Sequence, residues 1–457
     1  MIRRTLKQLQ NMITVENDPA PYEQVEINGV CIDSRKVKKG NLFVPLKGER
    51  VDGHRFVEDA IKNGAAAALW QKDVPNPPLH LPVLIVEETL SALQELARSY
   101  RRQLDVKVVG ITGSNGKTTT KDMTAALLSL RFKVQKTEGN LNNHIGMPLS
   151  ILNLEEDTEM AVLEMGMSSK GEIRFLSEMA APEAAIITNI GESHLLDLGS
   201  RDAIADAKME IIESLPPGGL AVFNGDEPLL QERMAAHDQT LTVKTFGRGR
   251  RNTLYPVFIE TGNEGSTFKV NGQDLLFNLP VLGIHNVLNA LAAMLTANHF
   301  GVPFEEMNEA FSTLKLTNMR MEMVQGAKGE KIINDAYNAS PTSMKAAIEL
   351  VEKLTGFSKK ILVLGDMLEL GPQEKEFHYE IGKSIDAGNV DYVFTMGKLA
   401  AYIAEGARES LPEDRVFSFP DKESLVKELK KRTDNNTLIL VKASRGMRME
   451  DIVHSLQ

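Results

Sequence analysis

The sequence feature that most restricts the fold is a glycine-rich turn between an apolar strand and a helix. Residues 108–121 have the sequence VVGITGSNGKTTTK, which predicts a strand over residues 106–111 and a helix over residues 117–130. The backbone N–H groups of such a turn bind phosphates, while Lys117 reaches the terminal phosphates and the Thr118 hydroxyl reaches magnesium. Position 111 is Ile, so the spacing GxxxxGK is replaced by TGxxGK[ST]. A turn that merely connects strand to helix is the alternative, and the Lys-Thr pair favours nucleotide binding.

Apolar strands alternate with helical stretches on both sides of this turn, which predicts an α/β protein with parallel sheets covered on both faces. The central strands are predicted at residues 160–164, 185–190 and 220–223, and those of a second open sheet at residues 360–364, 392–396 and 438–441. Helices of the second sheet are predicted to begin at Pro341, Glu374, Lys398 and Lys422. Segment 254–279 has alternating, NG-containing strand signals, which we interpret as an antiparallel edge excursion.

The length of 457 residues exceeds what one ordinary core holds, so several domains are expected. A small mixed α/β unit precedes the linker VPNPPLHLP at residues 74–82. We therefore predict three domains, over residues 1–82, 83–314 and 315–457.

Charge and cysteine content exclude some classes of partner and compartment. The formal net charge of -10 and the pI near 5.6 leave no global basic field, which argues against nucleic acid or an anionic membrane as the main partner. Cys31 is the single cysteine, so no intrachain disulfide can form and a reducing compartment is expected. The N-terminus lacks the apolar run of a signal peptide, and no stretch of about 18 apolar residues follows. These observations predict a soluble cytoplasmic protein without a membrane partner, and we expect a monomer.

Several polar residues follow the central strands, at the edge where parallel sheets bind ligands. Glu164 ends the strand MAVLE and could complete a magnesium site with Thr118, although an exposed acid at a strand end explains it equally well. His194, after TNIGES, is similarly placed, and we favour a metal role over a structural one. By spacing alone, Lys208 in ADAKMEIIESL is a solvated lysine on an amphipathic helix.

Other candidates are polar residues at helix starts and in turns. Asn286 and Asn289 lie one helical turn apart, and helix capping or base recognition would explain either of them. Arg320 could bind a phosphate or cover a surface, and Asp335 begins the junction DAYNASP. Ser34 and Arg35 follow a strand in IDSRKV, where an anion site and an ordinary turn are both plausible.

Together these stretches resemble the Mur ligase family over nearly the whole chain. The family's landmarks are matched in order by TGSNGKTTTK, TEGNLNNHIGMPLSIL, VLEMGMS, TNIGESHL, ADAKMEI, GIHNVLNALAA, INDAYNASP and LGDMLELG. Within the family, AYNASPTSM and LGDMLELG are similar to the branch that adds D-alanyl-D-alanine, and no DNPR-like motif of the branch that adds the third residue is found. Ser340 and Ser193 depart from the residues that many relatives carry.

The resemblance implies a role for each candidate residue. It implies a UDP-binding first domain, a central ATP-binding phosphate-loop domain and a Rossmann-like C-terminal domain. It implies ATP contacts from Gly113, Ser114, Asn115, Gly116, Lys117, Thr118, Thr119, Asn286 (adenine), Arg320 (phosphate) and Asp335 (ribose). Two Mg²⁺ ions are implied, with Thr118, Glu164, His194 and a carbamate on Lys208 as ligands. Ser34, Arg35 and the loop around Gly48 and Gly53 are implied to bind UDP, and Asn142 and Asn143 to lie near the muramoyl group.

The implied reaction joins D-alanyl-D-alanine to UDP-N-acetylmuramoyl-tripeptide through an acyl phosphate, with Lys117, His194, Lys208 and Arg320 as its catalytic groups. We expect the C-terminal domain to close over the nucleotide by a hinge near residues 314–317. No motif selects between lysine and diaminopimelate as the third residue of the peptide. The alternatives are a folylpolyglutamate-type ligase and a non-catalytic, nucleotide-gated binding protein.

Overall fold

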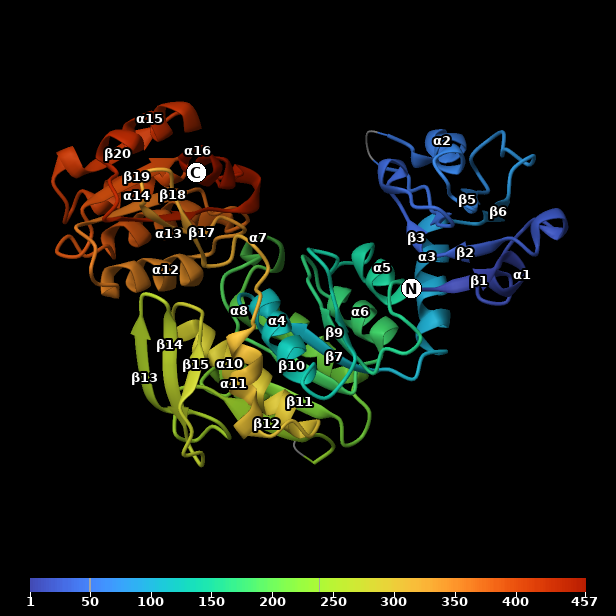
Figure 1. Ribbon diagram of the computed structural model, residues 1–457, viewed down its shortest axis with the longest axis horizontal. Helices are drawn as coiled ribbons and strands as arrows, with labels where there is room; N and C mark the ends of the chain where they lie inside the picture. Colours follow the sequence, from blue (N-terminus) through green and yellow to red (C-terminus); the bar gives the residue numbers. More distant parts are fainter. Residues whose placement is uncertain (49–50, 238) are drawn as a thin grey trace.

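The computed structural model describes residues 1–48, 51–237 and 239–457, which form three lobes. The N-terminal and C-terminal lobes lie on opposite sides of the central lobe (Figure 1). Each lobe contains its own mostly parallel sheet, so the predicted three-domain α/β class is confirmed. Within the described ranges, no helix combines the length and the apolar character needed to cross a bilayer.

The N-terminal lobe contains a four-stranded parallel sheet in the order β3-β4-β5-β6. Its elements are β1 (Arg3–Thr5), α1 (Leu6–Leu9), β2 (Glu26–Asn28), β3 (Val30–Cys31), β4 (Leu42–Phe43), α2 (Val57–Lys62), β5 (Ala67–Gln71) and β6 (Val83–Val86). Three 3-10 turns accompany them, at Ala20–Tyr22, Ser34–Lys36 and Gly53–Phe56. Because β6 pairs with β5, the sheet extends past the boundary predicted at residue 82.

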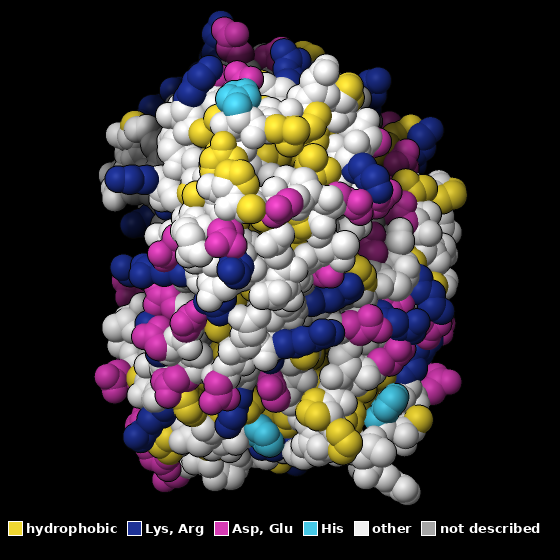
Figure 2. Space-filling model, turned by 90° about the vertical axis from the view of Figure 1, so that its right-hand side faces the viewer, with side chains coloured by type: hydrophobic (Ala, Val, Ile, Leu, Met, Phe, Trp, Pro, Cys, Tyr) yellow, Lys and Arg dark blue, Asp and Glu magenta, His cyan; other side chains and the backbone are white. Residues whose placement is uncertain are grey.

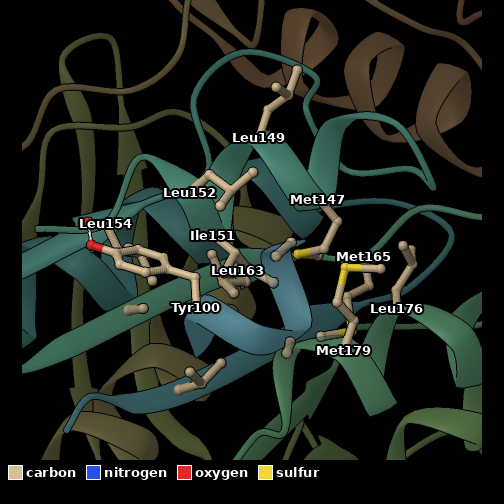
Figure 3. Packing of buried hydrophobic residues seen from close by; sticks show 14 of the residues in the cluster. Tyr100, Met147, Leu149, Ile151, Leu152, Leu154, Leu163, Met165, Leu176 and Met179 are labelled. Carbon is tan, nitrogen blue, oxygen red and sulfur yellow. Dashed lines mark hydrogen bonds between the residues drawn. The ribbon is translucent and has the colours of Figure 1, made fainter. Parts of the chain in front are cut away.

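The N-terminal lobe is joined to the central lobe through a continuous apolar core. The Ile2 N–H donates to the carbonyl of Leu152 at 2.8 Å, and the buried Tyr100 hydroxyl donates to the carbonyl of Leu154 at 2.8 Å. Figure 3 shows Tyr100 beside Leu152, Leu154 and Leu163, with Met147 and Met165 further along the same cluster. The chain's first strand and helix α3 (Thr89–Arg101) are therefore held against the central sheet.

The central sheet is six-stranded and parallel, in the order β12-β11-β10-β7-β9-β8. Its strands are β7 (Lys107–Thr112), β8 (Val134–Lys136), β9 (Met160–Glu164), β10 (Ala184–Ile187), β11 (Leu220–Asn224) and β12 (Thr242–Phe246). Its helices are α4 (Lys117–Leu128), α5 (Gly146–Leu152), α6 (Glu172–Ala180), α7 (Leu195–Leu198), α8 (Arg201–Met209), α9 (Pro228–Met234), α10 (Ile284–His299) and α11 (Met307–Ser312). The near-continuous apolar strands are buried because helices cover both faces.

The predicted excursion at residues 254–279 forms a separate antiparallel sheet of three strands, β13 (Pro256–Gly262), β14 (Gly265–Val270) and β15 (Phe277–Leu279). It is antiparallel as predicted but does not form an edge of the central sheet. The rings of Phe268 and Phe277 stack with their centroids 5.4 Å apart. Both residues belong to the same core as α10, so this sheet buries its inner face against helices.

The C-terminal lobe has a six-stranded sheet in the order β16-β17-β21-β18-β19-β20, in which only the edge pair β16-β17 is antiparallel. Its strands are β16 (Glu322–Gln325), β17 (Lys331–Asp335), β18 (Lys359–Gly365), β19 (Tyr392–Met396), β20 (Val416–Phe419) and β21 (Thr437–Lys442). Its helices are α12 (Pro341–Lys353), α13 (Glu374–Lys383), α14 (Ala400–Ala407), α15 (Lys422–Arg432) and α16 (Glu450–Leu456).

The linker between the central and C-terminal lobes is attached to the phosphate-loop helix. Both the backbone N–H and the hydroxyl of Thr317 donate to Asp122 Oδ2, at 2.8 and 2.9 Å. Asp122 is a buried residue of α4, and Lys136 lies 2.7 Å from its other oxygen. The C-terminal end of the predicted hinge is therefore fixed to the central lobe.

Acidic and basic side chains are interspersed over the face that includes the N-terminal lobe (Figure 2). No single sign of charge dominates the described residues of that face. An anionic substrate would therefore have to be bound by local cations rather than by a general surface potential.

Candidate active site

A cavity of about 440 Å³ is lined by residues of both the central and the C-terminal lobe. This volume lies in the range of sites that bind nucleotide-sized ligands. Most of the predicted site residues line it: Ser114, Asn115, Gly116, Lys117, Thr118, Thr119, Asn142, Asn143, Glu164, His194, Lys208, Asn286, Arg320 and Asp335. Segments far apart in the sequence are thus brought to one place.

The phosphate loop needs glycine at two positions. Gly113 has φ +147°, and an added Cβ would lie 1.8 Å from Thr188 Oγ1. Gly116 has φ +81°, and a Cβ there would lie 2.6 Å from Asn289 Oδ1. Both residues combine a left-handed backbone with a close neighbour, so a side chain would displace the loop from the strand ends.

Lys117 is the first residue of α4, and its ammonium group lies over the loop. Its Nζ donates to the carbonyl of Gly113 at 2.7 Å and is 3.4 Å from that of Ser114. Burial lowers its pKa from the ordinary value, the nearby Glu164 opposes that shift, and Arg320 adds to it. The N-terminus of α4 and the ammonium group of Lys117 therefore lie together, and both favour the binding of a phosphate group.

Glu164 is buried at the end of β9 and is held by two neighbours. Thr118 Oγ1 donates to its Oε2 at 2.8 Å, and Asn142 Nδ2 donates to its Oε1 at 2.8 Å. Hydroxyl and carboxylate oxygens are the ligands that Mg²⁺ prefers, together with substrate phosphates and water. The pair Thr118 and Glu164 therefore fits a magnesium ion bound to a nucleotide.

Lys208 is only 1% exposed, which corrects its interpretation as a solvated helix lysine. Lys208 lies on the buried face of α8 and lines the cavity, whereas the charged residues Arg201, Asp202 and Asp206 occupy the exposed face of the helix. Burial lowers the pKa of Lys208 well below its ordinary value, and the neighbouring positive charge of Lys117 adds to the shift. Burial and the nearby charge therefore favour the neutral amine over the ammonium ion at this position.

His194 lines the same cavity from the loop before α7. Burial lowers its pKa, Lys117 acts in the same direction, and Glu369 opposes them. Among the residues that the structure describes, no three His, Cys, Asp or Glu side chains cluster as a complete metal site. His194 would therefore need a further ligand to hold a cation.

The two asparagines of α10 line the cavity and are hydrogen-bonded to one another. Asn286 Nδ2 donates to the carbonyl of Leu282 at 2.7 Å, and Asn289 Nδ2 donates to Asn286 Oδ1 at 3.1 Å. Asn289 also packs against Gly116, so this pair supports the phosphate loop. The adenine contact of Asn286 stays a prediction.

Arg320 and Asp335 reach the cavity from the C-terminal lobe. The Arg320 guanidinium lies 4.2 Å from the centre of the Tyr337 ring, and its buried Nε has no partner in the described structure. Asp335 Oδ2 lies 2.5 Å from Lys442 Nζ, which also donates to the carbonyl of Asn338 at 3.0 Å. A stacked guanidinium with a free donor is suited to bind phosphate.

The predicted substrate residues are divided between two places. Asn143 Oδ1 accepts the N–H groups of Ile145 and Gly146, so it also holds the turn that leads into α5. Ser34 and Arg35 lie in a 3-10 turn of the N-terminal lobe, and Arg35 pairs with Asp33 at 2.8 Å. In the predicted loop between Gly48 and Gly53, residues 49–50 lie outside the described residues.

Sequence analysis did not assign Lys442, His285 or Glu369 to the site. Lys442 stands opposite Asp335 in the β17-β21 register, so both occupy the carboxyl edge of adjacent parallel strands. That shared edge was the signal that could have revealed it. Burial lowers the pKa of His285 to about 4, and this neutral imidazole also lines the cavity.

The fold and the site define a three-domain, phosphate-loop α/β protein whose nucleotide site lies between two lobes. Three family models match successive parts of the chain: "Mur ligase family, catalytic domain" at residues 26–101, "Mur ligase middle domain" at 111–297 and "Mur ligase, glutamate ligase domain" at 319–445. The chain belongs to the Mur ligase family.

Relatives and solved structures agree with this assignment. The UDP-N-acetylmuramoyl-tripeptide--D-alanyl-D-alanine ligase of Bacillus subtilis is 51% identical over 100% of this chain and 99% of its own length, and that of Escherichia coli is 34% identical over 100% and 99%. The crystal structure of MurF from Acinetobacter baumannii matches with TM-score 0.89 at 31% identity, covering 100% of this chain and 99% of that chain. MurF ligase from Thermotoga maritima in complex with ADP matches with TM-score 0.81 at 31% identity, covering 94% and 97%.

A more distant structure shows the fold alone. The Mycobacterium tuberculosis folylpolyglutamate synthase complexed with ADP is 18% identical, with TM-score 0.64, and covers 80% of this chain and 94% of that chain.

We predict that Lys442→Ala destabilises the C-terminal lobe far more than Lys359→Ala. The side chains of Lys442 and Asp335 are 3% and 14% exposed, whereas those of Lys359 and Asp434 are 35% and 44% exposed. Breaking the buried pair leaves an uncompensated carboxylate and should cost roughly 3–5 kcal/mol, against about 1 kcal/mol or less for the exposed pair. Urea unfolding followed by circular dichroism measures the free energy of unfolding of both variants. Equal losses of stability would show that the buried Lys442–Asp335 pair contributes no more than the exposed pair.

Proposed function

We infer that the chain is an ATP-dependent ligase that joins D-alanyl-D-alanine to UDP-N-acetylmuramoyl-tripeptide. The observation that carries this conclusion is the full-length match, at 51% identity, to the Bacillus subtilis ligase of that name. The product is the muramoyl pentapeptide precursor of peptidoglycan, used for cell-wall biogenesis, cell shape and division. The cavity at the carboxyl edge of the central sheet is where ATP binds.

The first step forms an acyl phosphate. A carboxylate oxygen of the tripeptide attacks the γ-phosphorus of ATP, and the bond to the β–γ bridging oxygen breaks to release ADP. Because nucleophile and phosphates are all anionic, cations must converge on them. Lys117 at the helix start and Arg320 from the C-terminal lobe supply that charge.

The second step forms the amide bond. The amine of D-alanyl-D-alanine bonds to the acyl carbon, loses a proton, and phosphate leaves with the electrons of its C–O bond. Water would hydrolyse the acyl phosphate, so the site has to be enclosed. The C-terminal lobe contributes to this enclosure, since Ser340 Oγ donates to Asn115 Oδ1 at 3.1 Å and Thr342 Oγ1 donates to Glu192 Oε2 at 2.7 Å.

Two magnesium ions are part of the proposal, and they would neutralise phosphate charge and polarise the γ-phosphorus when bound. Thr118 and Glu164 would hold the first, an assignment supported by their mutual hydrogen bond. His194 and Lys208 would hold the second. A bare ammonium repels a cation, so Lys208 is proposed to carry a carbamate, formed when its neutral amine captures carbon dioxide.

The remaining residues are assigned to binding. Gly113, Ser114, Asn115, Gly116 and Thr119 surround the ATP phosphates, while Asn286 contacts adenine and Asp335 the ribose. Ser34 and Arg35 bind the UDP end, and Asn142 and Asn143 lie near the muramoyl group. We place the enzyme in the cytoplasm as a monomer, a proposal supported by the single cysteine and by a cavity that one chain supplies.

Phosphate release from ATP tests this function. Turnover should depend strongly on both UDP-N-acetylmuramoyl-tripeptide and D-alanyl-D-alanine, and the mass of the product should equal that of the pentapeptide nucleotide. Turnover indifferent to either substrate would exclude this ligase. Turnover with a folate substrate and glutamate would indicate the folylpolyglutamate type, and nucleotide binding without turnover would indicate a binding protein.

Lys117→Ala is expected to lower the ligation rate by about 100-fold to 1000-fold or more, because the variant loses the cation over the phosphates. Calorimetry should show that UDP-N-acetylmuramoyl-tripeptide still binds, since UDP recognition is assigned to the N-terminal lobe. Loss of that binding in a folded variant would contradict the division of roles between the lobes.

Lys208→Ala should lose most of the activity while the fold is retained. If the missing group is a carboxylate, acetate should restore part of the rate to this variant and none to Lys117→Ala. Peptide mass spectrometry under trapping conditions should find the added mass of carbon dioxide on Lys208. Near-full activity of the alanine variant would refute the carbamate.

A further inference from the structure

Glu369 of the C-terminal lobe contacts the loop that carries His194. Its carboxylate Oε2 lies 3.0 Å from His194 Nδ1, and its backbone carbonyl accepts the N–H of Leu196 at 3.2 Å. The two groups are within ion-pair distance, although the geometry at Nδ1 is not that of a hydrogen bond. Side chain and backbone together therefore join loops of two different lobes.

Both residues of this contact have an unusual backbone. His194 and Glu369 each have φ of +65°, in the left-handed region that residues other than Gly seldom adopt, with Asn, Asp and His the more frequent exceptions. Such a conformation is strained and persists where the surroundings determine it. Two strained residues that face one another across a lobe boundary indicate a constraint beyond simple packing.

The loop that carries Glu369 is firmly attached to its own lobe. The Met367 N–H donates to His378 Nε2 at 2.8 Å, and the Leu368 N–H donates to Ser444 Oγ at 2.9 Å. Buried His378 is itself fixed, because its Nδ1 lies 2.6 Å from the carbonyl of Glu374. Glu369 is thus presented to the central lobe by a rigid support.

An imidazole that binds a cation through one nitrogen usually donates its other N–H to a carboxylate, which sets the tautomer and the ring orientation. In His194 the nitrogen beside a carboxylate is Nδ1, which leaves Nε2 available in the cavity that this residue lines. The partner carboxylate comes from the lobe that is expected to move.

We propose that Glu369 is a positioning residue that holds His194 in its ligand orientation, and that it does so only when the C-terminal lobe is closed. This inference rests on the proposed second magnesium site. Its consequence is that lobe closure and completion of the cation site are the same event. An open enzyme would bind ATP with its first ion, and only the closed enzyme would bind the second ion tightly.

The test measures Mn²⁺ affinity by electron paramagnetic resonance, with a non-hydrolysable ATP analogue and the muramoyl nucleotide at saturation. Glu369→Ala should weaken the second Mn²⁺ site by about 10-fold or more, the scale of losing such a carboxylate partner. Glu369→Gln keeps an oxygen that can accept a hydrogen bond from Nδ1–H, so this variant should retain part of the affinity for the second Mn²⁺. Exposed Glu376, on α13 of the same lobe, provides the matched control Glu376→Gln, which should bind Mn²⁺ like the wild type.

His194→Ala separates the two levels of the proposal. If that variant binds Mn²⁺ with unchanged stoichiometry and affinity, His194 is not a ligand and the proposed assignment of the second magnesium site is overturned. If His194→Ala loses the second ion but Glu369→Ala keeps wild-type affinity, only the positioning role is overturned. Small-angle scattering of the same samples reports closure, and a Glu369→Ala enzyme that opens without any loss of Mn²⁺ affinity would also overturn that role.

Discussion

The close approach of the phosphate loop to its neighbours is the constraint on which the site depends. Gly113 and Gly116 lie so near Thr188 and Asn289 that a Cβ at either position would overlap a side chain. This packing places Lys117 at the start of α4 and directs Thr118 towards Glu164. The electrostatics follow from the same geometry, since Lys117 and the buried Lys208 line one cavity and the charge of Lys117 adds to the lowering of the Lys208 pKa.

Elements whose signal is local were predictable from the sequence. The strands at Met160–Glu164 and Tyr392–Met396 have the predicted bounds, because short apolar runs flanked by polar turns describe buried strands well. Helix α12 begins at Pro341 as predicted, where Ser340 caps the helix. By contrast β5 was not predicted, since its alanines favour helix and only burial between β4 and β6 makes it a strand.

The site was predictable to the extent that its residues end strands or begin helices. Thr118, Glu164 and Asp335 obey that rule, and the structure places all three around one cavity. Lys208 does not, because helical spacing cannot distinguish a solvated lysine from one that is turned into a buried pocket. The contact of His194 with Glu369 depends on how two lobes are arranged, which no local pattern encodes.

The attachment of Thr317 to Asp122 has a mechanical consequence. Asp122 follows Lys117 by five residues, about 7.5 Å along a helix axis. Helix α4 therefore carries a residue of the proposed nucleotide site in its first turn and holds the interdomain linker from its second turn. A shift of α4 on phosphate binding would move Asp122 and, through its hydrogen bonds, Thr317 of the linker. The linker would therefore follow the phosphate loop instead of moving independently of it.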